Sequence, residues 1–208
     1  MRILDLCAGE GGEQRRLNIE ARGHEYVTVD YLARFCCTIT ADVFSLTAEA
    51  LGPFDFVWAS PPCEAFSVAS IGHHWTGGKR AYVPKTEHAA YSQKLVERLV
   101  CLMQSINPRL GWLMENPRGV LRKLPCVAGL PRVTVTYCAY GDGRMKPTDI
   151  WGHVPGWTPR KMCKNGMRCH ASAPRGAKTG TQGIKGAAAR AVVPWELWEE
   201  ILTALEAA

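Results

Sequence analysis

Long hydrophobic runs are absent from the 208-residue sequence. A transmembrane helix needs about 20 consecutive apolar residues, so the sequence predicts no membrane-spanning segment. The opening residues, MRILDLCAGEGG, contain an acid at position 5 and turn at glycines, which is not the pattern of a signal peptide. Without an export signal, the nine cysteines are expected to be reduced thiols that serve packing, catalysis or metal binding. We therefore expect a cytoplasmic protein.

Acidic residues are absent between positions 150 and 195, whereas the same stretch carries eight lysines and arginines. The net charge of the whole chain is only +6, so the rest of the chain is slightly acidic. Residues 152–186 also contain ten glycines and prolines, which exclude a long helix there. A positive field concentrated in one loop-rich segment is expected of a surface that meets nucleic acid. The alternative is a solvated basic loop without a partner.

Hydrophobic residues make up 47% of the chain and charged residues 21%, which excludes wholesale disorder. Apolar and β-branched runs predict strands, and apolar residues at helical spacing predict helices between them. The predicted strands are 2–7, 25–30, 38–40, 54–60, 112–115 and 133–137, and the predicted helices are 13–22, 46–51, 88–106 and a last one from about residue 194. Residues 61–87 are expected to form a long loop. The alternation predicts an α/β doubly wound sheet, whose ligands bind at the carboxyl ends of the strands.

A glycine-rich turn, Asp5-Leu-Cys-Ala-Gly-Glu-Gly-Gly12, follows the first predicted strand. Such a turn lets the backbone approach a bound nucleoside closely. Asp30 and Tyr31 end the second strand, where a carboxylate can accept from ribose hydroxyls and an aromatic ring can cover adenine. Asp42, after the third strand, can accept from an adenine amino group. Because the turn also carries Glu10 and Glu13, it favours a cationic nucleoside without phosphates, such as S-adenosylmethionine, over a dinucleotide. A tight turn without a ligand is the alternative.

The fourth predicted strand ends in Ser60-Pro61-Pro62-Cys63. Two prolines fix the backbone and direct the following cysteine out of the end of the strand, as a nucleophile requires. A thiolate suits addition to an electron-poor ring carbon, provided that its surroundings lower its pKa. The alternative is a small buried apolar residue, which is the usual state of a free cysteine.

Two further groups of polar residues follow predicted strands. Glu115 and Asn116 end the fifth strand, where a carboxyl group at the same sheet edge as Cys63 can hold or donate a proton. The alternative is an exposed acid paired with Arg118. Arg144 and Lys146 lie on one face of an extended segment and can bind a phosphate and a base carbonyl, or remain solvated.

Cys163, Cys169 and His170 lie together in the basic segment. Two thiols and an imidazole are zinc ligands, and a glycine-rich loop with little core could use a metal to hold it together. Cys138 and His153 are the candidates for a fourth ligand. The spacing of five residues between the two cysteines is not that of a known zinc knuckle, so reduced cysteines packed under a loop are the competing interpretation.

Taken in order, these motifs resemble those of the DNA cytosine-5 methyltransferases. The glycine-rich turn resembles the first motif of the family, with Cys7 where phenylalanine is usual, and Pro62-Cys63 resembles the catalytic Pro-Cys motif. Glu115-Asn116-Pro117 resembles Glu-Asn-Val, and Arg144-Met-Lys146 is similar to Arg-x-Arg. Residues 190–193, Arg-Ala-Val-Val, resemble the last motif, with arginine where asparagine is usual. The resemblance covers roughly residues 1–151 and 186–205, and the short segment between them resembles phage-encoded members.

The resemblance implies a Rossmann-like S-adenosylmethionine-dependent methyltransferase sheet with helices on both faces. Residues 1–151 are then the catalytic domain, 152–186 a minimal, basic, loop-rich target-recognition insert, and 187–208 a C-terminal helix that returns to the catalytic domain. The implied cofactor-binding residues are Asp5, Cys7, Gly9, Gly11, Asp30, Tyr31, Asp42, Val43, Pro62, Arg190 and Val192. The implied catalytic residues are Cys63, Glu115, Asn116, Arg144 and Lys146.

The implied reaction is transfer of a methyl group to C5 of a cytosine that is flipped out of double-stranded DNA. Cys63 adds to C6, Glu115 stabilises a proton on N3, and Asn116 orients the Pro-Cys loop. We expect a monomer that reads a short site of about two to four base pairs, because so small an insert places few side chains on base edges. Three alternatives remain: the same chemistry on RNA, a modified methyl donor, and a DNA-binding module that has kept the fold without catalysis.

Overall fold

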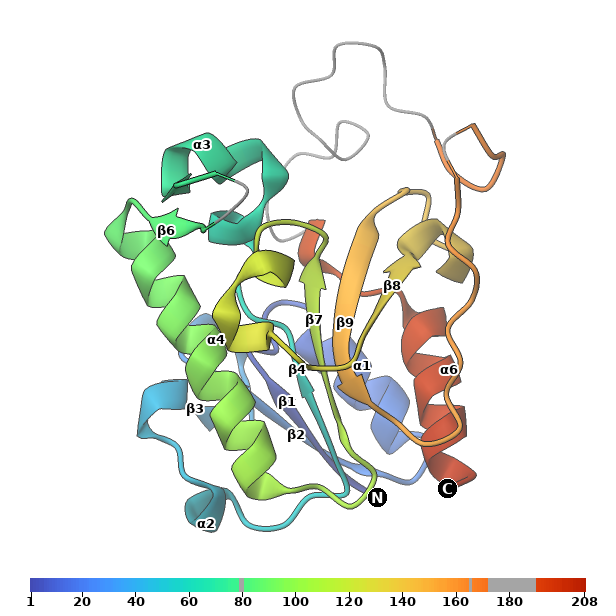
Figure 1. Cartoon of the computed structure of the whole chain (residues 1–208). Helices are drawn as coiled ribbons and strands as arrows, with labels where there is room; N and C mark the ends of the chain where they lie inside the picture. The colour runs from blue at the N-terminus through green and yellow to red at the C-terminus, as the bar shows by residue number, and fades with distance from the viewer. Residues whose placement is uncertain (79–80, 165, 172–189) are drawn as a thin grey trace.

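The computed structural model describes residues 1–78, 81–164, 166–171 and 190–208, and a seven-stranded sheet forms its centre (Figure 1). The strands lie in the order β3-β2-β1-β4-β7-β9-β8. Their bounds are β1 Arg2–Leu6, β2 Glu25–Asp30, β3 Ile39–Thr40, β4 Phe56–Ala59, β7 Trp112–Pro117, β8 Arg132–Thr136 and β9 Pro147–His153. Strand β9 runs antiparallel to both of its neighbours, and the other pairs are parallel. This mostly parallel sheet with helices around it confirms the predicted α/β fold class.

Helices cover both faces of the sheet, with α4 on one side and α1 and α6 on the other (Figure 1). The helices are α1 Gly12–Glu20, α2 Ala48–Leu51, α3 Ile71–His74, α4 Glu87–Ile106 and α6 Trp195–Glu206. Helix α4 begins where the Thr86 hydroxyl accepts from the Ala89 amide, and it ends at Asn107 in a left-handed conformation. No helix in the described ranges is both long and apolar enough to cross a bilayer.

Side chains of β1 alternate between the two faces, as successive residues of a strand do. Leu4 and Leu6 pack in the core beneath α4, whereas Ile3 packs with the Leu197 and Trp198 side chains of α6. Asp5 therefore points to the α6 face of the sheet.

Two segments differ from the sequence-based expectation. Residues 61–87, expected to be a loop, contain α3 and a small hairpin of β5 (Trp75–Thr76) and β6 (Val83–Pro84). The Trp75 side chain anchors this hairpin, since it is buried and its indole Nε1 donates to the Ala65 carbonyl at 2.6 Å. Residues 147–153 form strand β9, which lies between β7 and β8, whereas the sequence analysis placed Arg144 and Lys146 only in an extended segment and predicted no strand there. The first residue of β9 is proline, which a strand tolerates only at its start or edge. The composition of this segment therefore did not indicate a strand.

The described part of the basic segment runs along α6. Arg160 donates to Glu200 at 2.8 Å and to Glu196 at 2.9 Å, and Trp157 donates to Glu200 at 3.2 Å. The Arg160 charge is thus matched by acids of the C-terminal helix. By contrast, Lys161, Lys164 and Arg168 are exposed. Arg175, Lys178 and Lys185, which the sequence analysis counted among the basic residues, lie outside the described residues.

Candidate active site

The glycine-rich turn after β1 is built on left-handed backbone. Cys7 has a φ of 59° and Gly9 a φ of 57°. The Gly9 amide donates to one oxygen of Asp30 at 3.2 Å, and the Leu32 amide donates to the other at 3.0 Å. The carboxylate at the end of β2 is therefore fixed between the two loops that follow β1 and β2. Burial raises the pKa of the Cys7 thiol, and the nearby Asp30 carboxylate adds to the effect, so Cys7 stays a neutral thiol.

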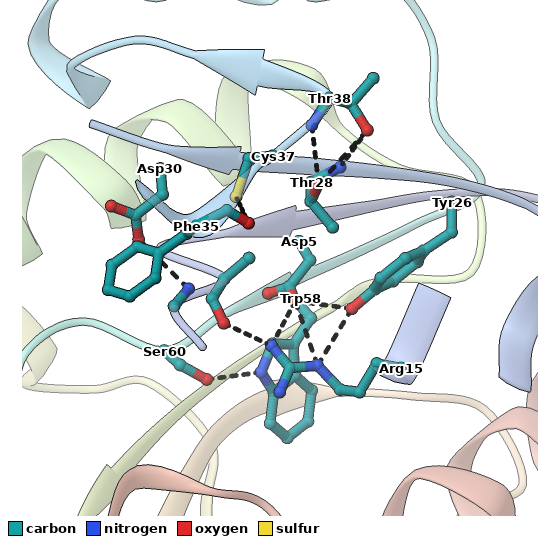
Figure 2. Close-up of polar contacts among 12 residues, drawn as sticks. Asp5, Arg15, Tyr26, Thr28, Asp30, Phe35, Cys37, Thr38, Trp58 and Ser60 are labelled. Carbon is teal, nitrogen blue, oxygen red and sulfur yellow. Dashed lines mark hydrogen bonds and ion pairs between the residues drawn. The ribbon is translucent and has the colours of Figure 1, made fainter. Parts of the chain in front are cut away.

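Beneath this turn, Asp5 is held by a buried hydrogen-bond network (Figure 2). One oxygen of Asp5 accepts from Arg15 Nη2 at 2.7 Å and from the Tyr26 hydroxyl at 2.6 Å. Arg15 Nη2 also donates to the Ala8 carbonyl at 2.7 Å, and so ties α1 to the turn. A Cβ at residue 11 would require the Arg15 guanidinium to shift. Asp5, expected to bind the cofactor, is thus placed below the turn and engaged by Arg15 and Tyr26.

Two cavities open above the turn, at the carboxyl ends of β1, β2 and β4. The first has a volume of about 300 Å³ and the second of about 380 Å³. They share the residues Cys7, Asp30, Tyr31, Pro62 and Glu64, and so form one continuous cleft. A cleft of this size is typical of small-molecule sites.

Most of the expected cofactor-binding residues line this cleft. Those of the first cavity are Cys7, Gly9, Gly11, Asp30, Tyr31, Pro62 and Val192, and the second adds Asp42 and Val43. Asp5 and Arg190 are not among the lining residues. The second cavity is also lined by Tyr91 and Ser92 of α4, which the sequence analysis did not single out because they read as part of a helix. Asp30 and Glu64 line both cavities, Glu10 lines the first beside Arg15 and Arg34, and Asp42 lines the second. The carboxylates suit a cationic nucleoside without phosphates.

Cys63 lies in the loop after β4, four residues beyond its last residue Ala59, and is half-buried on the wall of the first cavity. Asn116, at the end of the neighbouring strand β7, donates from Nδ2 to the Pro61 carbonyl at 2.9 Å. This bond ties the Pro-Cys loop to β7. Burial raises the pKa of the Cys63 thiol, the Lys146 charge opposes that rise, and the Glu115 charge adds to it. The pKa of the thiol is thus raised, whereas the sequence analysis required surroundings that lower it, and of these influences only the Lys146 charge acts in the required direction.

Glu115 is buried at the end of β7, on the same face of the sheet as Asp5. Its Oε1 accepts from the Tyr137 hydroxyl at 2.8 Å, and Lys146 Nζ lies 3.9 Å away. Burial raises the pKa of Glu115, and Lys146 and Tyr137 oppose the rise. Sequence analysis missed Tyr137, because a buried tyrosine after a strand gives no local sign of the acid that it contacts.

Arg144 and Lys146 both connect the C-terminal segment to the wall beside Glu115. Lys146 Nζ donates to the Arg190 carbonyl at 2.9 Å and lies 4.6 Å from the centre of the Tyr137 ring. Arg144 pairs with Asp142, and its Nη2 donates to the Val192 carbonyl at 3.1 Å. Both side chains are buried. The structure thus brings both basic residues to the site and engages them with protein atoms.

A second cluster lies beside the active-site wall formed by Glu115, Tyr137, Arg144 and Lys146, since its Cys138 directly follows Tyr137 in the chain. Cys163 Sγ is 3.1 Å from Cys169 Sγ and 3.4 Å from His170 Nδ1. Cys138, one of the two candidates for a fourth ligand, belongs to the same group, and all four ligand atoms lie within 4.8 Å of one another. His153, the other candidate, is not in this group. Three sulfurs and an imidazole nitrogen so arranged could hold a metal ion.

Comparison with known proteins identifies the family. A protein of Frog virus 3 (isolate Goorha), named probable DNA (cytosine-5)-methyltransferase, is 31% identical over 172 residues, which are 81% of this chain and 78% of the viral protein. The solved S. pombe Dnmt2 methyltransferase covers 78% of this chain with a TM-score of 0.50 and 13% identity, and this chain spans only about half (53%) of it. No protein-family profile matches the chain. The structural likeness shows the methyltransferase fold, and the viral relative shows that the chain belongs to the DNA cytosine-5 methyltransferase family.

Proposed function

We propose that the chain transfers a methyl group from S-adenosylmethionine to C5 of cytosine in double-stranded DNA, through a covalent bond between Cys63 and a flipped base. One observation carries the proposal: Cys63 lies on the wall of the nucleoside-sized cleft and is coupled to Glu115 and Lys146. A nucleophile, a proton-holding acid and a cofactor cleft at one sheet edge are what this chemistry needs. A binding module without catalysis would need neither the thiol nor the buried acid.

The cleft fits S-adenosylmethionine, which supplies an electrophilic methyl group when bound. Asp30 would accept from the ribose hydroxyls, Tyr31 would cover adenine, and Asp42 would accept from its amino group. Pro62 and Val192 supply apolar wall between this nucleoside end and Cys63. The described residues thus offer acceptors for the ribose hydroxyls and for the adenine amino group.

On the base, the Cys63 thiolate forms a bond from Sγ to C6. The C5–C6 electron pair moves into the ring, and N3 takes a proton from Glu115. C5 would then bond to the methyl carbon as the methyl–sulfur bond of the sulfonium breaks and its electron pair stays on sulfur, and C5 would give up its own proton to water. The Sγ–C6 bond breaks as the double bond re-forms, which returns Cys63 as a thiolate and N3's proton to Glu115. The burial that raises the pKa of Glu115 supports this role, because it favours the protonated form that must donate.

DNA is favoured over RNA by the name of the viral relative, and the exposed Lys161, Lys164 and Arg168 suit a phosphate backbone. We propose that residues 152–186 are the target-recognition insert between catalytic residues 1–151 and a returning helix within 187–208. A phage or viral origin, action as a monomer and a cytoplasmic location complete the proposal, with the viral relative as support for the first.

Replacing the nucleophile tests the proposal most directly. Cys63→Ser is expected to abolish methyl transfer while the chain still folds and binds S-adenosylmethionine, because a serine hydroxyl is a far poorer nucleophile at neutral pH. The matched control is Cys101→Ser, at an exposed cysteine of α4, which should stay fully active. An oligonucleotide with 5-fluorocytosine should trap the wild type covalently, since fluorine at C5 cannot leave as a proton does.

The same covalent trapping experiment distinguishes a DNA substrate from an RNA substrate. Matched DNA and RNA oligonucleotides, each with 5-fluorocytosine, should give a denaturant-resistant adduct with DNA alone. An adduct with RNA alone would leave the chemistry standing and change the substrate. Substantial methylation by Cys63→Ser would overturn the covalent mechanism itself.

A further inference from the structure

The four ligand atoms of the second cluster match a closed metal site in composition and spacing. Zinc in structural sites binds four cysteine and histidine ligands tetrahedrally, with bonds of about 2.3 Å to sulfur. Two sulfurs on one such ion lie about 3.8 Å apart. The Cys163 and Cys169 sulfurs, 3.1 Å apart, would have to separate by about 0.7 Å to reach that distance. The distances of 3.4 Å and 3.6 Å from these sulfurs to His170 Nδ1 already lie near the separation of about 3.6 Å expected for a sulfur and an imidazole nitrogen on one zinc ion.

The chain builds this cluster from two segments that are far apart in sequence. Cys138 lies in the 3-10 helix η7 (Tyr137–Tyr140), between β8 and β9. The other three ligands flank one turn, with Cys163 before it and Cys169 and His170 after it. In this turn the Met167 amide donates to the Lys164 carbonyl, and Gly166 has a φ of 89°. That turn brings Cys169 back to Cys163, and so explains how a spacing of five residues can chelate.

Backbone bonds hold the same segment against the active-site wall. The Cys163 amide donates to the Thr136 hydroxyl at 2.8 Å, and the Ala171 amide donates to the Gly143 carbonyl at 3.0 Å. Apolar burial contributes little here, since Met162 and Met167 are exposed. A segment with few buried side chains and two such hydrogen bonds is weakly held, unless a bound metal ion adds further bonds between the segment and the wall.

We infer that Cys138, Cys163, Cys169 and His170 bind one Zn²⁺ that fastens the basic segment to the wall of the active site. All four positions of the ion are filled by protein, so the site is structural and leaves no position for a substrate. Two residues that hold the ion or its segment are direct neighbours of active-site residues in the chain. Cys138 directly follows Tyr137, whose hydroxyl donates to Glu115, and Gly143 directly precedes Arg144.

Metal content tests the inference without an activity assay, so its outcome is independent of the proposed methylation. The full chain, purified under reducing conditions, should hold about one zinc per chain by mass spectrometry of metals. Cobalt(II) exchanged into the site should show the sulfur-to-metal absorption and intense visible bands of a tetrahedral thiolate site. Cys138→Ser and Cys169→Ser should lose most of the bound metal and those bands, whereas Cys101→Ser and His153→Ala should keep both.

Folding of the variants is checked separately, because Cys138 is buried. Cys169 is exposed, so Cys169→Ser removes a ligand without disturbing the core. Thermal stabilisation by S-adenosylmethionine reports whether the cofactor cleft is intact in each variant. Folded Cys169→Ser without zinc supports the inference. Wild type that binds no zinc, a Cys138→Ser variant that holds as much zinc as wild type, or a Cys163–Cys169 disulfide in the purified protein would each overturn it.

Discussion

Two buried carboxylates lie on the α6 face of the same sheet, one in each half of the molecule, and their surroundings differ. Asp5, under the cofactor cleft, faces Arg15 at 2.7 Å and the Tyr26 hydroxyl at 2.6 Å. Glu115, beside Cys63, faces the Tyr137 hydroxyl at 2.8 Å and a lysine only at 3.9 Å. Both acids are at most 4% exposed.

The difference separates an acid that supports the fold from one that can exchange a proton. A guanidinium in direct contact compensates the desolvation of Asp5, and the pair joins α1, β1 and β2. Glu115 has a more distant cation and a neutral hydroxyl, so burial dominates and raises its pKa. An acid whose charged form is only partly compensated keeps its proton to a higher pH than a solvated acid does, which favours proton donation to a base.

The largest expected effect is on catalysis at Glu115. Glu115→Gln should lower the single-turnover methylation rate by about 10²- to 10⁴-fold, because the variant cannot give a proton to N3. DNA affinity and the urea midpoint of unfolding should change little, since glutamine keeps the shape and can accept from Tyr137. Parallel measurement of rate, DNA affinity and unfolding checks this. If affinity fell in step with the rate, Glu115 would be a binding residue and the contrast with Asp5 would weaken.

A somewhat smaller effect, on stability and not on chemistry, is expected at Asp5. Asp5→Asn leaves the buried Arg15 charge without its partner, which should cost about 3–5 kcal/mol in the free energy of unfolding. Glu20→Gln is the matched control, because it breaks the exposed Arg16–Glu20 pair of the same helix, worth about 0.5 kcal/mol. Urea unfolding of both variants measures the difference. Equal losses in the two variants would show that the Asp5 pair adds nothing beyond a surface ion pair.

The fold and most cleft-lining residues were accessible from sequence, because they follow local patterns. Helix 88–106 was predicted within one residue of Glu87–Ile106, since its apolar residues recur at helical spacing. Strand β2 was predicted over 25–30, the same range as in the structure. Glycine turns, strand-end acids and the Pro-Pro-Cys corner are also local, and they place residues at the sheet edge.

Contacts between residues far apart in the chain could not be predicted from the sequence. The assignment of Asp5 to the cofactor used its position in the motif alone, whereas its partners Arg15 and Tyr26 come from other elements. The same holds for the Tyr137–Glu115 bond. Strand β9 was missed because both of its faces are covered, so it shows no alternation, and its buried Asp149 reads as a loop residue until its pairing with Arg122 is seen.

The smallest expected effect tests whether the two charges beside Cys63 act on it as the structure indicates. Burial raises the pKa of Cys63, so its alkylation by iodoacetamide should still rise with pH above pH 8, as the thiolate fraction grows. Glu115 raises this pKa and Lys146 lowers it, so Glu115→Gln should speed alkylation and Lys146→Met should slow it. Because a thiolate of lower pKa is also less nucleophilic, each unit of pKa change should alter the rate by only about threefold.

Alkylation of the exposed Cys101 in the same sample, followed by peptide mass spectrometry, is the internal reference. Equal Cys63 alkylation rates in the wild type and in Glu115→Gln would mean that Glu115 does not act on the thiol before DNA binds. Glu115 would then resemble Asp5, as a buried acid without influence on the nucleophile.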